Sequence, residues 1–154
     1  MSMRGLSGLA VIVVVGIGAL LVFGRGGGVA PKPAAFAGTV LLDEALSRSA
    51  AEGRPVLVFA TADWCGPCQS LKRGALASAK LEQTIRSSTI PVYADVTGDD
   101  AASMEAAQRL GVGSIPALIL VWNGREVARH EGNAPAPAIE KWLDAALAAA
   151  RSAS

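Results

Sequence analysis

A short apolar run that leads directly into two cysteines constrains the fold of this chain more than any other feature. Residues 55–61 read Pro-Val-Leu-Val-Phe-Ala-Thr, which is typical of a strand buried on both faces. Cys65 and Cys68, the only cysteines, follow within Trp-Cys-Gly-Pro-Cys. Pro67 suits the first turn of a helix, where its missing N–H would have no partner. The pattern therefore places both cysteines where a buried strand meets the start of a helix.

The rest of the chain predicts one domain with a mixed sheet and helices on both faces. Apolar residues at helical spacing indicate the helices, and Asn123-Gly124 predicts a hairpin between the last two strands. The predicted order is helix 40–52, strand 55–61, one helix from Cys68 through Ala79, strand 90–96, helix 101–110, strands 116–122 and 125–131, and helix 138–150.

An uncharged apolar block, residues 6–23, precedes this domain. As a helix at ~1.5 Å per residue it would span roughly 27 Å, enough to cross a bilayer. A buried domain helix is disfavoured because no polar face interrupts the block. A cleaved signal peptide is the stronger alternative, but the nearest small-x-small site, Ala35-Phe36-Ala37, lies well beyond it. We expect residues 1–24 to be an uncleaved transmembrane signal anchor.

The segments around the domain follow from composition. Residues 25–38, rich in Gly, Pro and Ala, are expected to be a flexible linker, residues 39–150 the folded domain, and residues 151–154 a short tail. Basic residues flank the apolar block on both sides, so the flanking charge does not decide the orientation of the block in a membrane. An extracytoplasmic domain on a bacterial inner membrane is therefore a hypothesis. The formal net charge of +1 gives no electrostatic case for a nucleic-acid partner.

Three roles for the cysteine pair compete. A structural disulfide closing so short a loop would constrain the unfolded chain little. A metal site needs roughly four ligands, and the sole histidine, His130, lies far along the chain. Redox exchange fits best, because a helix start offers unpaired N–H groups that stabilise a thiolate. Such placement can lower a cysteine pKa from about 8.5 to roughly 7. Cys65 would then attack a disulfide, and Cys68 would resolve the mixed disulfide.

These motifs also carry a family resemblance. Residues 62–68, followed by Gly113-Ser114-Ile115-Pro116, Asn123-Gly124 and Gly132, resemble the thioredoxin family in order and spacing. Residues 94–100 running into 110–112 are similar to the C-terminal thioredoxin-like domain of the bacterial protein DsbD. The resemblance implies an α/β thioredoxin fold, here preceded by one N-terminal transmembrane helix.

The resemblance also implies a substrate surface. Pro116 would be a cis proline beside the active site, and the Ile115 backbone would pair with an extended substrate segment. The rest of the apolar contact surface would be formed by Trp64, Gly66, Pro67 and Gly132.

The implied activity is reduction of protein disulfides without a cofactor. A membrane electron donor of the DsbD or CcdA type would recharge the cysteines, since one membrane helix and two cysteines cannot carry electrons across a bilayer. A cytochrome c maturation factor or a misoxidised extracytoplasmic protein would be the substrate. The alternatives are a noncatalytic peptide-binding module of the same fold, and copper or zinc delivery through the two cysteines.

Two positions depart from the family. Where thioredoxins bury an aspartate beneath the second cysteine, this chain has Phe59, and the usual partner lysine falls near Tyr93. Neither handles the Cys68 proton in the usual way, because phenylalanine does not titrate and tyrosine keeps its proton to about pH 10. Water, the substrate thiolate, or a carboxylate such as Asp63 or Asp95 must take that role.

We therefore predict that Cys68 resolves mixed disulfides more slowly than in a general thioredoxin. Replacement of Phe59→Asp restores a titratable group and is expected to change the pH dependence of disulfide reduction. The measurement is the reduction rate of wild type and variant across pH. An unchanged rate–pH profile would contradict the prediction.

Overall fold

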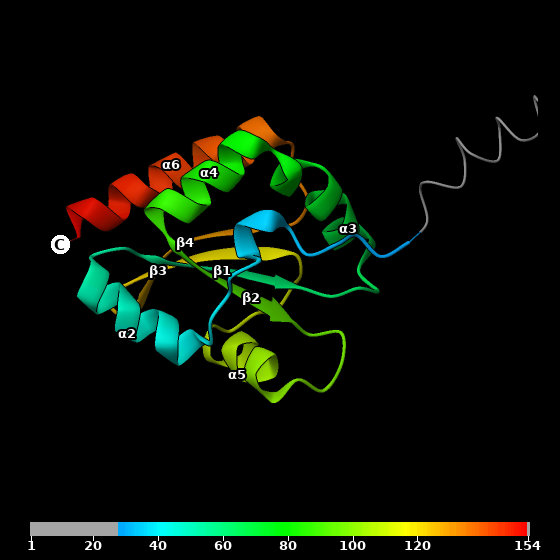
Figure 1. Ribbon diagram of the computed structural model, residues 1–154, viewed down its shortest axis with the longest axis horizontal. Coiled ribbons are helices and arrows are strands. Elements are labelled where there is room, and N and C mark those ends of the chain that lie inside the picture. Colours follow the sequence, from blue (N-terminus) through cyan, green and yellow to red (C-terminus); the bar gives the residue numbers. More distant parts are fainter. Residues whose placement is uncertain (1–27, 154) are drawn as a thin grey trace, which may run out of the picture.

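The structure, a computed structural model, describes residues 28–153 as a four-stranded sheet between two helical layers (Figure 1). The strand order is β2-β1-β3-β4, with β1 parallel to β2 and the other neighbours antiparallel. The mixed sheet predicted from the sequence is thus confirmed. The strands are β1 (Val56–Thr61), β2 (Ile90–Asp95), β3 (Ala117–Trp122) and β4 (Arg125–Glu131).

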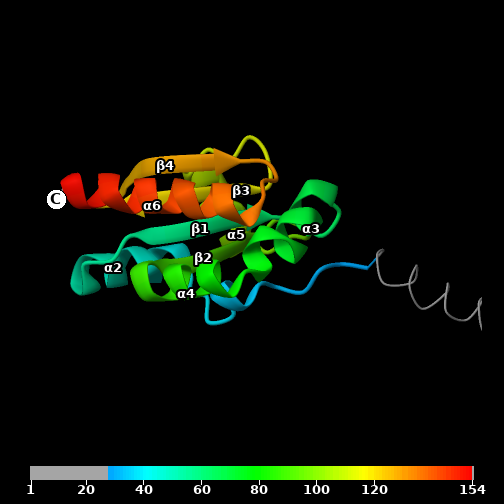
Figure 2. The same cartoon turned by 90° about the horizontal axis from the view of Figure 1, so that it is seen from above.

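The central strand β1 is buried along its whole length and divides the core in two. Leu57 and Phe59 point into one core cluster, and Val56, Val58 and Ala60 into the other. Figures 1 and 2 show the two layers. One layer holds α2 (Leu42–Glu52) and α5 (Ala101–Arg109), and the other η1 (Ala34–Phe36), α4 (Ala79–Ser88) and α6 (Ala136–Ser152).

The helix expected to run from Cys68 through Ala79 is interrupted, so that prediction is wrong. The chain forms α3 (Gly66–Arg73), a short turn η2 (Ala75–Ala77) and then α4. Gly74 has φ −96° and ψ −99°, and a Cβ there would lie 2.9 Å from the Ser70 carbonyl oxygen. The Ser78 hydroxyl accepts a hydrogen bond from the Leu81 N–H and starts α4 anew. The break leaves α3 as a short separate helix that carries the cysteines.

The hairpin between β3 and β4 follows the expected turn chemistry. Asn123 and Gly124 adopt φ values of 51° and 73°, the positive angles that a two-residue hairpin turn requires. A register shift between Leu120 and Val121 then pairs Leu118 with His130 and Ala117 with Glu131 across the two strands. The hairpin brings the end of β4 beside the start of β3.

Side chains close the outer edge of β2. Pro91 has no N–H, the Tyr93 N–H donates to Thr39 Oγ1 at 2.7 Å, and the Asp95 N–H donates to Ser103 Oγ at 3.2 Å. An open edge of N–H groups would invite another strand. The outward N–H groups of this edge strand are thus already satisfied within the domain.

The segment before α2 packs into the domain. Ala35 and Phe36 belong to the core cluster of Phe59, and the Phe36 side chain is fully buried. The expectation that the linker 25–38 stays outside the core is therefore wrong for these two residues. The physical reason is that the Phe36 ring packs against the rings of Phe59 and Tyr93.

The predicted anchor, residues 1–24, lies outside the described residues. Between residues 28 and 153, none of the helices combines the length and apolar character needed to cross a membrane.

Truncation of Phe36→Ala is expected to destabilise the domain by about 3–5 kcal/mol, because it empties a fully buried aromatic site. Denaturant unfolding measures the effect. The matched control is Val29→Ala, since Val29 is 61% exposed in the same segment, and its cost should stay within about 0.5 kcal/mol. Equal effects of the two changes would show that the segment does not pack as described.

Candidate active site

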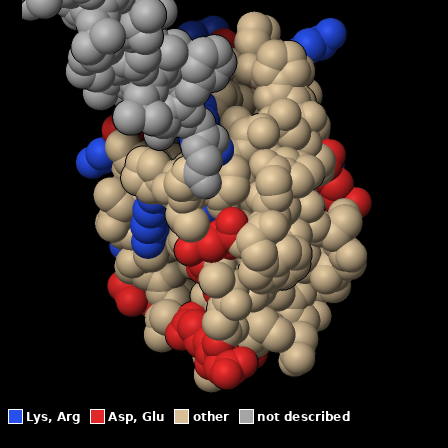
Figure 3. All heavy atoms as spheres, turned by 90° about the vertical axis from the view of Figure 1, so that its right-hand side faces the viewer, with Lys and Arg blue, Asp and Glu red and all other residues tan. Residues whose placement is uncertain are grey.

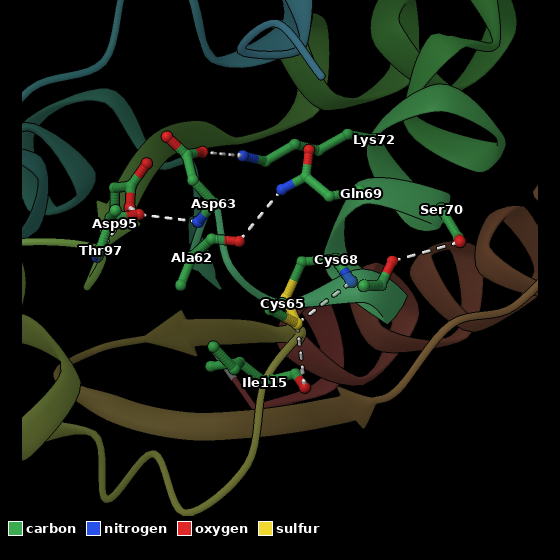
Figure 4. The surroundings of a disulfide bond; sticks show 11 residues. Ala62, Asp63, Cys65, Cys68, Gln69, Ser70, Lys72, Asp95, Thr97 and Ile115 are labelled. Carbon is green, nitrogen blue, oxygen red and sulfur yellow. Dashed lines mark hydrogen bonds and ion pairs between the residues drawn. A yellow bond between two sulfur atoms is a disulfide. The ribbon is translucent and has the colours of Figure 1, made fainter. Parts of the chain in front are cut away.

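Cys65 and Cys68 form a disulfide at the start of α3 (Figure 4). Their Cα atoms are 5.2 Å apart, and Cys65 is the N-cap of the helix. The Cys68 N–H donates to Cys65 Sγ at 3.2 Å. When the disulfide is reduced, the same N–H group and the helix dipole are placed to stabilise negative charge on Cys65 Sγ. The predicted position of the pair, between a buried strand and a helix, is confirmed.

The two cysteines differ in exposure, which favours different roles for them. Cys68 is completely buried, whereas Cys65 keeps 6% of its surface accessible. Both pack against Ala62, and Val96 and Ile115 cover the cluster. A substrate sulfur can approach Cys65 but not Cys68. The geometry therefore fits attack by Cys65 and internal resolution by Cys68.

The loop before β3 lies against the disulfide. The Ile115–Pro116 peptide bond is cis, as the resemblance implied, and the Ile115 carbonyl oxygen lies 3.7 Å from Cys65 Sγ. The Gly132 N–H donates to the Pro116 carbonyl at 2.8 Å, and Gly132 has φ 86°, a value that favours glycine. Ile115, Pro116 and Gly132, far apart in the sequence, thus meet beside Cys65.

The surface around the disulfide is largely uncharged. Trp64 is 69% exposed, and Gly66 and Pro67 are exposed beside it. Figure 3 shows this end of the molecule as a mainly uncharged face with acidic groups gathered below it. A hollow of about 380 Å³ next to Trp64 is lined by Val96, Met104, Ala107, Gln108, Gly111, Val112, Gly113, Ser114 and Ile115. The six predicted substrate contacts lie around the cysteines, and their binding of substrate stays a prediction.

Phe59 and Tyr93 occupy the two departures from the family pattern, paired in register between β1 and β2. Phe59 is fully buried, with its ring centroid 5.5 Å from that of Phe36 and 5.8 Å from that of Tyr93. Burial raises the pKa of Tyr93 above its usual value, against a lowering by its hydrogen bond with Lys72. Tyr93 therefore stays protonated at neutral pH.

A buried lysine, missed in the sequence analysis, stands near these rings. The Lys72 side chain is 1% exposed, and its Nζ lies 3.3 Å from Asp63 Oδ1 (Figure 4). Burial lowers the Lys72 pKa, but hydrogen bonds and attraction from Tyr93 and Asp63 outweigh it and leave the pKa raised. Its spacing could have indicated this position in the sequence. Lys72 follows Cys68 by four residues, which places both on the same face of a helix.

Gln69 joins the active-site loop to the N-terminal segment. Its Nε2 donates to the Ala62 carbonyl at 3.1 Å, and its Oε1 accepts from the Ala30 N–H at 2.6 Å. The Ala62 carbonyl also accepts from the Cys65 N–H at 3.3 Å. The Asp63 N–H donates to Thr97 Oγ1 at 2.7 Å. These bonds fix the loop that presents Cys65.

Comparison with known proteins identifies similar domains. A family model described as a thioredoxin-like domain matches residues 42–147. Thioredoxin C-3 of Corynebacterium nephridii is 31% identical over 93 residues, which are 60% of this chain and 59% of that protein. The thiol:disulfide interchange protein DsbD of Cronobacter sakazakii is 30% identical over 105 residues, 66% of this chain and 18% of that protein. The chain thus spans only part of either relative's length.

A solved structure supports the fold. The C-terminal domain of DsbD from Neisseria meningitidis, in the oxidised form, superposes with a TM-score of 0.57 and 20% sequence identity. The match covers 68% of this chain and 91% of that one. At this identity the likeness concerns the fold alone.

Proposed function

Because the chain belongs to the thioredoxin-like domain family, we propose that it is a thiol–disulfide oxidoreductase that reduces protein disulfides. The observation that carries the proposal is the Cys65–Cys68 pair, with the more exposed cysteine at the N-cap of α3 and the fully buried one a turn further on. Alignments with a thioredoxin and with a thiol:disulfide interchange protein support the same chemistry.

The reaction begins with the reduced pair. The Cys65 thiolate attacks a substrate disulfide and forms a mixed disulfide, while one substrate sulfur leaves as a thiolate and takes up a proton. Cys68 then loses its proton and attacks Cys65 Sγ, and the second substrate sulfur leaves as a thiol. Two electrons pass from the cysteine pair to the substrate. The protein ends as the disulfide of the present structure.

The residues between the cysteines support electron flow from this chain to its substrates. Gly66-Pro67 is the pair found in thioredoxin, whose potential is about −270 mV, so this chain acts as a reductant. Its substrates are protein disulfides, met as extended segments at Ile115 and on the uncharged surface around Trp64. A membrane protein of the DsbD or CcdA type returns electrons to the pair. Cytochrome c maturation factors and misoxidised extracytoplasmic proteins are the substrates proposed by analogy.

Insulin reduction tests the activity. The wild-type chain with a dithiol reductant should precipitate reduced insulin chains at least ~100-fold faster than Cys65→Ser, because only Cys65 can start the exchange. Cys68→Ser should instead accumulate a mixed disulfide with its substrate, which mass spectrometry identifies. Equal background rates for wild type and Cys65→Ser would favour the noncatalytic binding module. Stoichiometric copper or zinc after anaerobic purification would favour metal delivery.

The location is a second part of the proposal. Residues 1–24 anchor the chain in the bacterial inner membrane, and the domain faces the extracytoplasmic side. The support is the uncharged apolar block and the oxidising compartment in which disulfide reduction is needed.

In cells that make the full chain, alkaline extraction should leave it in the membrane pellet, and protease added to spheroplasts should digest the domain. The double replacement Val13→Arg and Val14→Arg should release the chain, since each charge at a bilayer centre costs about 2.5–3.5 kcal/mol. Recovery of the wild type in the soluble fraction, or a mature N-terminus beyond residue 24, would contradict the anchor.

A further inference from the structure

Lys72 lies on the helix that carries both cysteines. It follows Cys68 by four residues on α3, so the two side chains share the inner face of the helix. Both residues are buried: 4% of the whole Lys72 residue is exposed, and none of Cys68. Long side chains on helices lean back toward the N-terminus, which for Lys72 is the turn that carries Cys68. Figure 4 shows the Lys72 side chain running toward Asp63.

The titratable groups around the Lys72 ammonium group come from the active-site loop, from β2 and from the segment before η1. Asp63 of the active-site loop binds it at 3.3 Å, and the Tyr93 ring of β2 lies with its centroid 5.5 Å away. Lys32, from the segment before η1, lies 4.6 Å from the same ring centroid. Asp95 at the end of β2 attracts Lys32. The cluster thus holds two cations, two carboxylates and one phenol.

Exposure distinguishes the two charges of the Lys72–Asp63 pair. The Asp63 side chain is 37% exposed, whereas that of Lys72 is 1% exposed. Water screens the charge of an exposed carboxylate far more than that of a buried ammonium. Within this pair, the ammonium group is therefore the less screened charge. Phe59, which stands where the family has a carboxylate, adds no opposing charge.

We propose that Lys72, which follows Cys68 by one helical turn, is a positioning residue for thiol–disulfide exchange whose buried positive charge favours the thiolate forms of both cysteines. The inference rests on the proposed function and deepens it. It answers how Cys68 can lose a proton in a site that lacks the family's buried aspartate. The charge comes from the helix that bears the cysteines, in place of the acid on the neighbouring strand.

The step that Lys72 assists is the resolution of the mixed disulfide. Cys68 gives up its proton to water, and its sulfur attacks Cys65 Sγ. The bond between Cys65 and the substrate sulfur breaks, and its electron pair leaves on that sulfur, which takes a proton from water. The Cys65–Cys68 bond forms, so protons and electrons balance. Lys72 keeps its own proton throughout, because its contacts with Tyr93 and Asp63 hold its pKa above the ordinary value.

The test follows resolution directly. The reduced full chain is mixed with an aromatic disulfide that releases a coloured thiolate, once when Cys65 attacks and once when Cys68 resolves. For Lys72→Met, the second release at neutral pH should be at least ~3-fold slower, and its pH profile should move up by about half a pH unit. Lys72→Arg should restore the profile. Arg73→Met, which removes an exposed charge from the same helix, is the matched control and should move it little.

Asp63→Asn supplies a test of opposite sign. Removing the carboxylate strengthens the positive field, so the second release should become faster at neutral pH and its profile should move down. A purely structural role would shift both variants in the same direction. That outcome, or a wild-type profile in folded Lys72→Met, would overturn the inference. If Lys72→Met fails to fold, Asp63→Asn and Lys72→Arg still decide.

The same experiment separates the inference from the proposed function. A wild-type chain that releases both coloured thiolates and reduces insulin supports the function, whatever Lys72→Met does. A wild-type chain that releases only one, or that leaves insulin intact, contradicts the proposed function itself.

Discussion

The hydrogen bond from the Cys68 N–H to Cys65 Sγ is the contact on which the rest of the site depends. It exists because Cys65 caps α3, and α3 begins there because the buried strand β1 ends just before it. The cap makes one sulfur accessible and electrostatically favoured as a thiolate, and it places the other sulfur one turn deeper. The Ile115–Pro116 loop and Gly132 then complete the site from the opposite side. The sheet thus serves to hold three separate chain segments around one sulfur.

The charges behind this sulfur differ from the pattern of the family that the chain resembles. An aromatic pair, Phe59 and Tyr93, stands where the resemblance places the buried acid and its lysine partner. A cation returns from another element, since Lys72 on α3 lies near the Tyr93 ring and pairs with Asp63. The positive charge near residue 93 thus comes from α3 in this chain, whereas the resemblance places it on β2.

Local patterns predicted much of the fold, because each carries its own physical cause. The apolar run of β1, the Asn123-Gly124 turn and the cysteines at a helix start all lie where the sequence placed them. The break at Gly74 was not predictable, since a single glycine inside an apolar helical pattern is usually tolerated. Burial of Phe36 also escaped prediction, because its partners Phe59 and Tyr93 lie far along the chain.

The same limit applies to the site. The position of the two cysteines followed from a short motif and the cis Ile115–Pro116 bond from the family resemblance, whereas the pairing of Lys72 with Asp63 depends on tertiary packing. Helical spacing alone puts Lys72 on the same helix face as Cys68. A lysine exposed to solvent could have the same spacing, so the sequence does not show that Lys72 is buried. Only the packing of α3 against β1 and β2 decides that this cation is buried.

Ultraviolet absorbance of the reduced protein, followed across pH, reads the thiolate of Cys65 directly. The account predicts a titration step at least one pH unit below the value of about 8.5 for a free cysteine, lost in Cys65→Ser and kept in Cys68→Ser. A step at about 8.5 in the wild type would contradict it, because the head of α3 would then give Cys65 no acidity beyond that of an ordinary thiol.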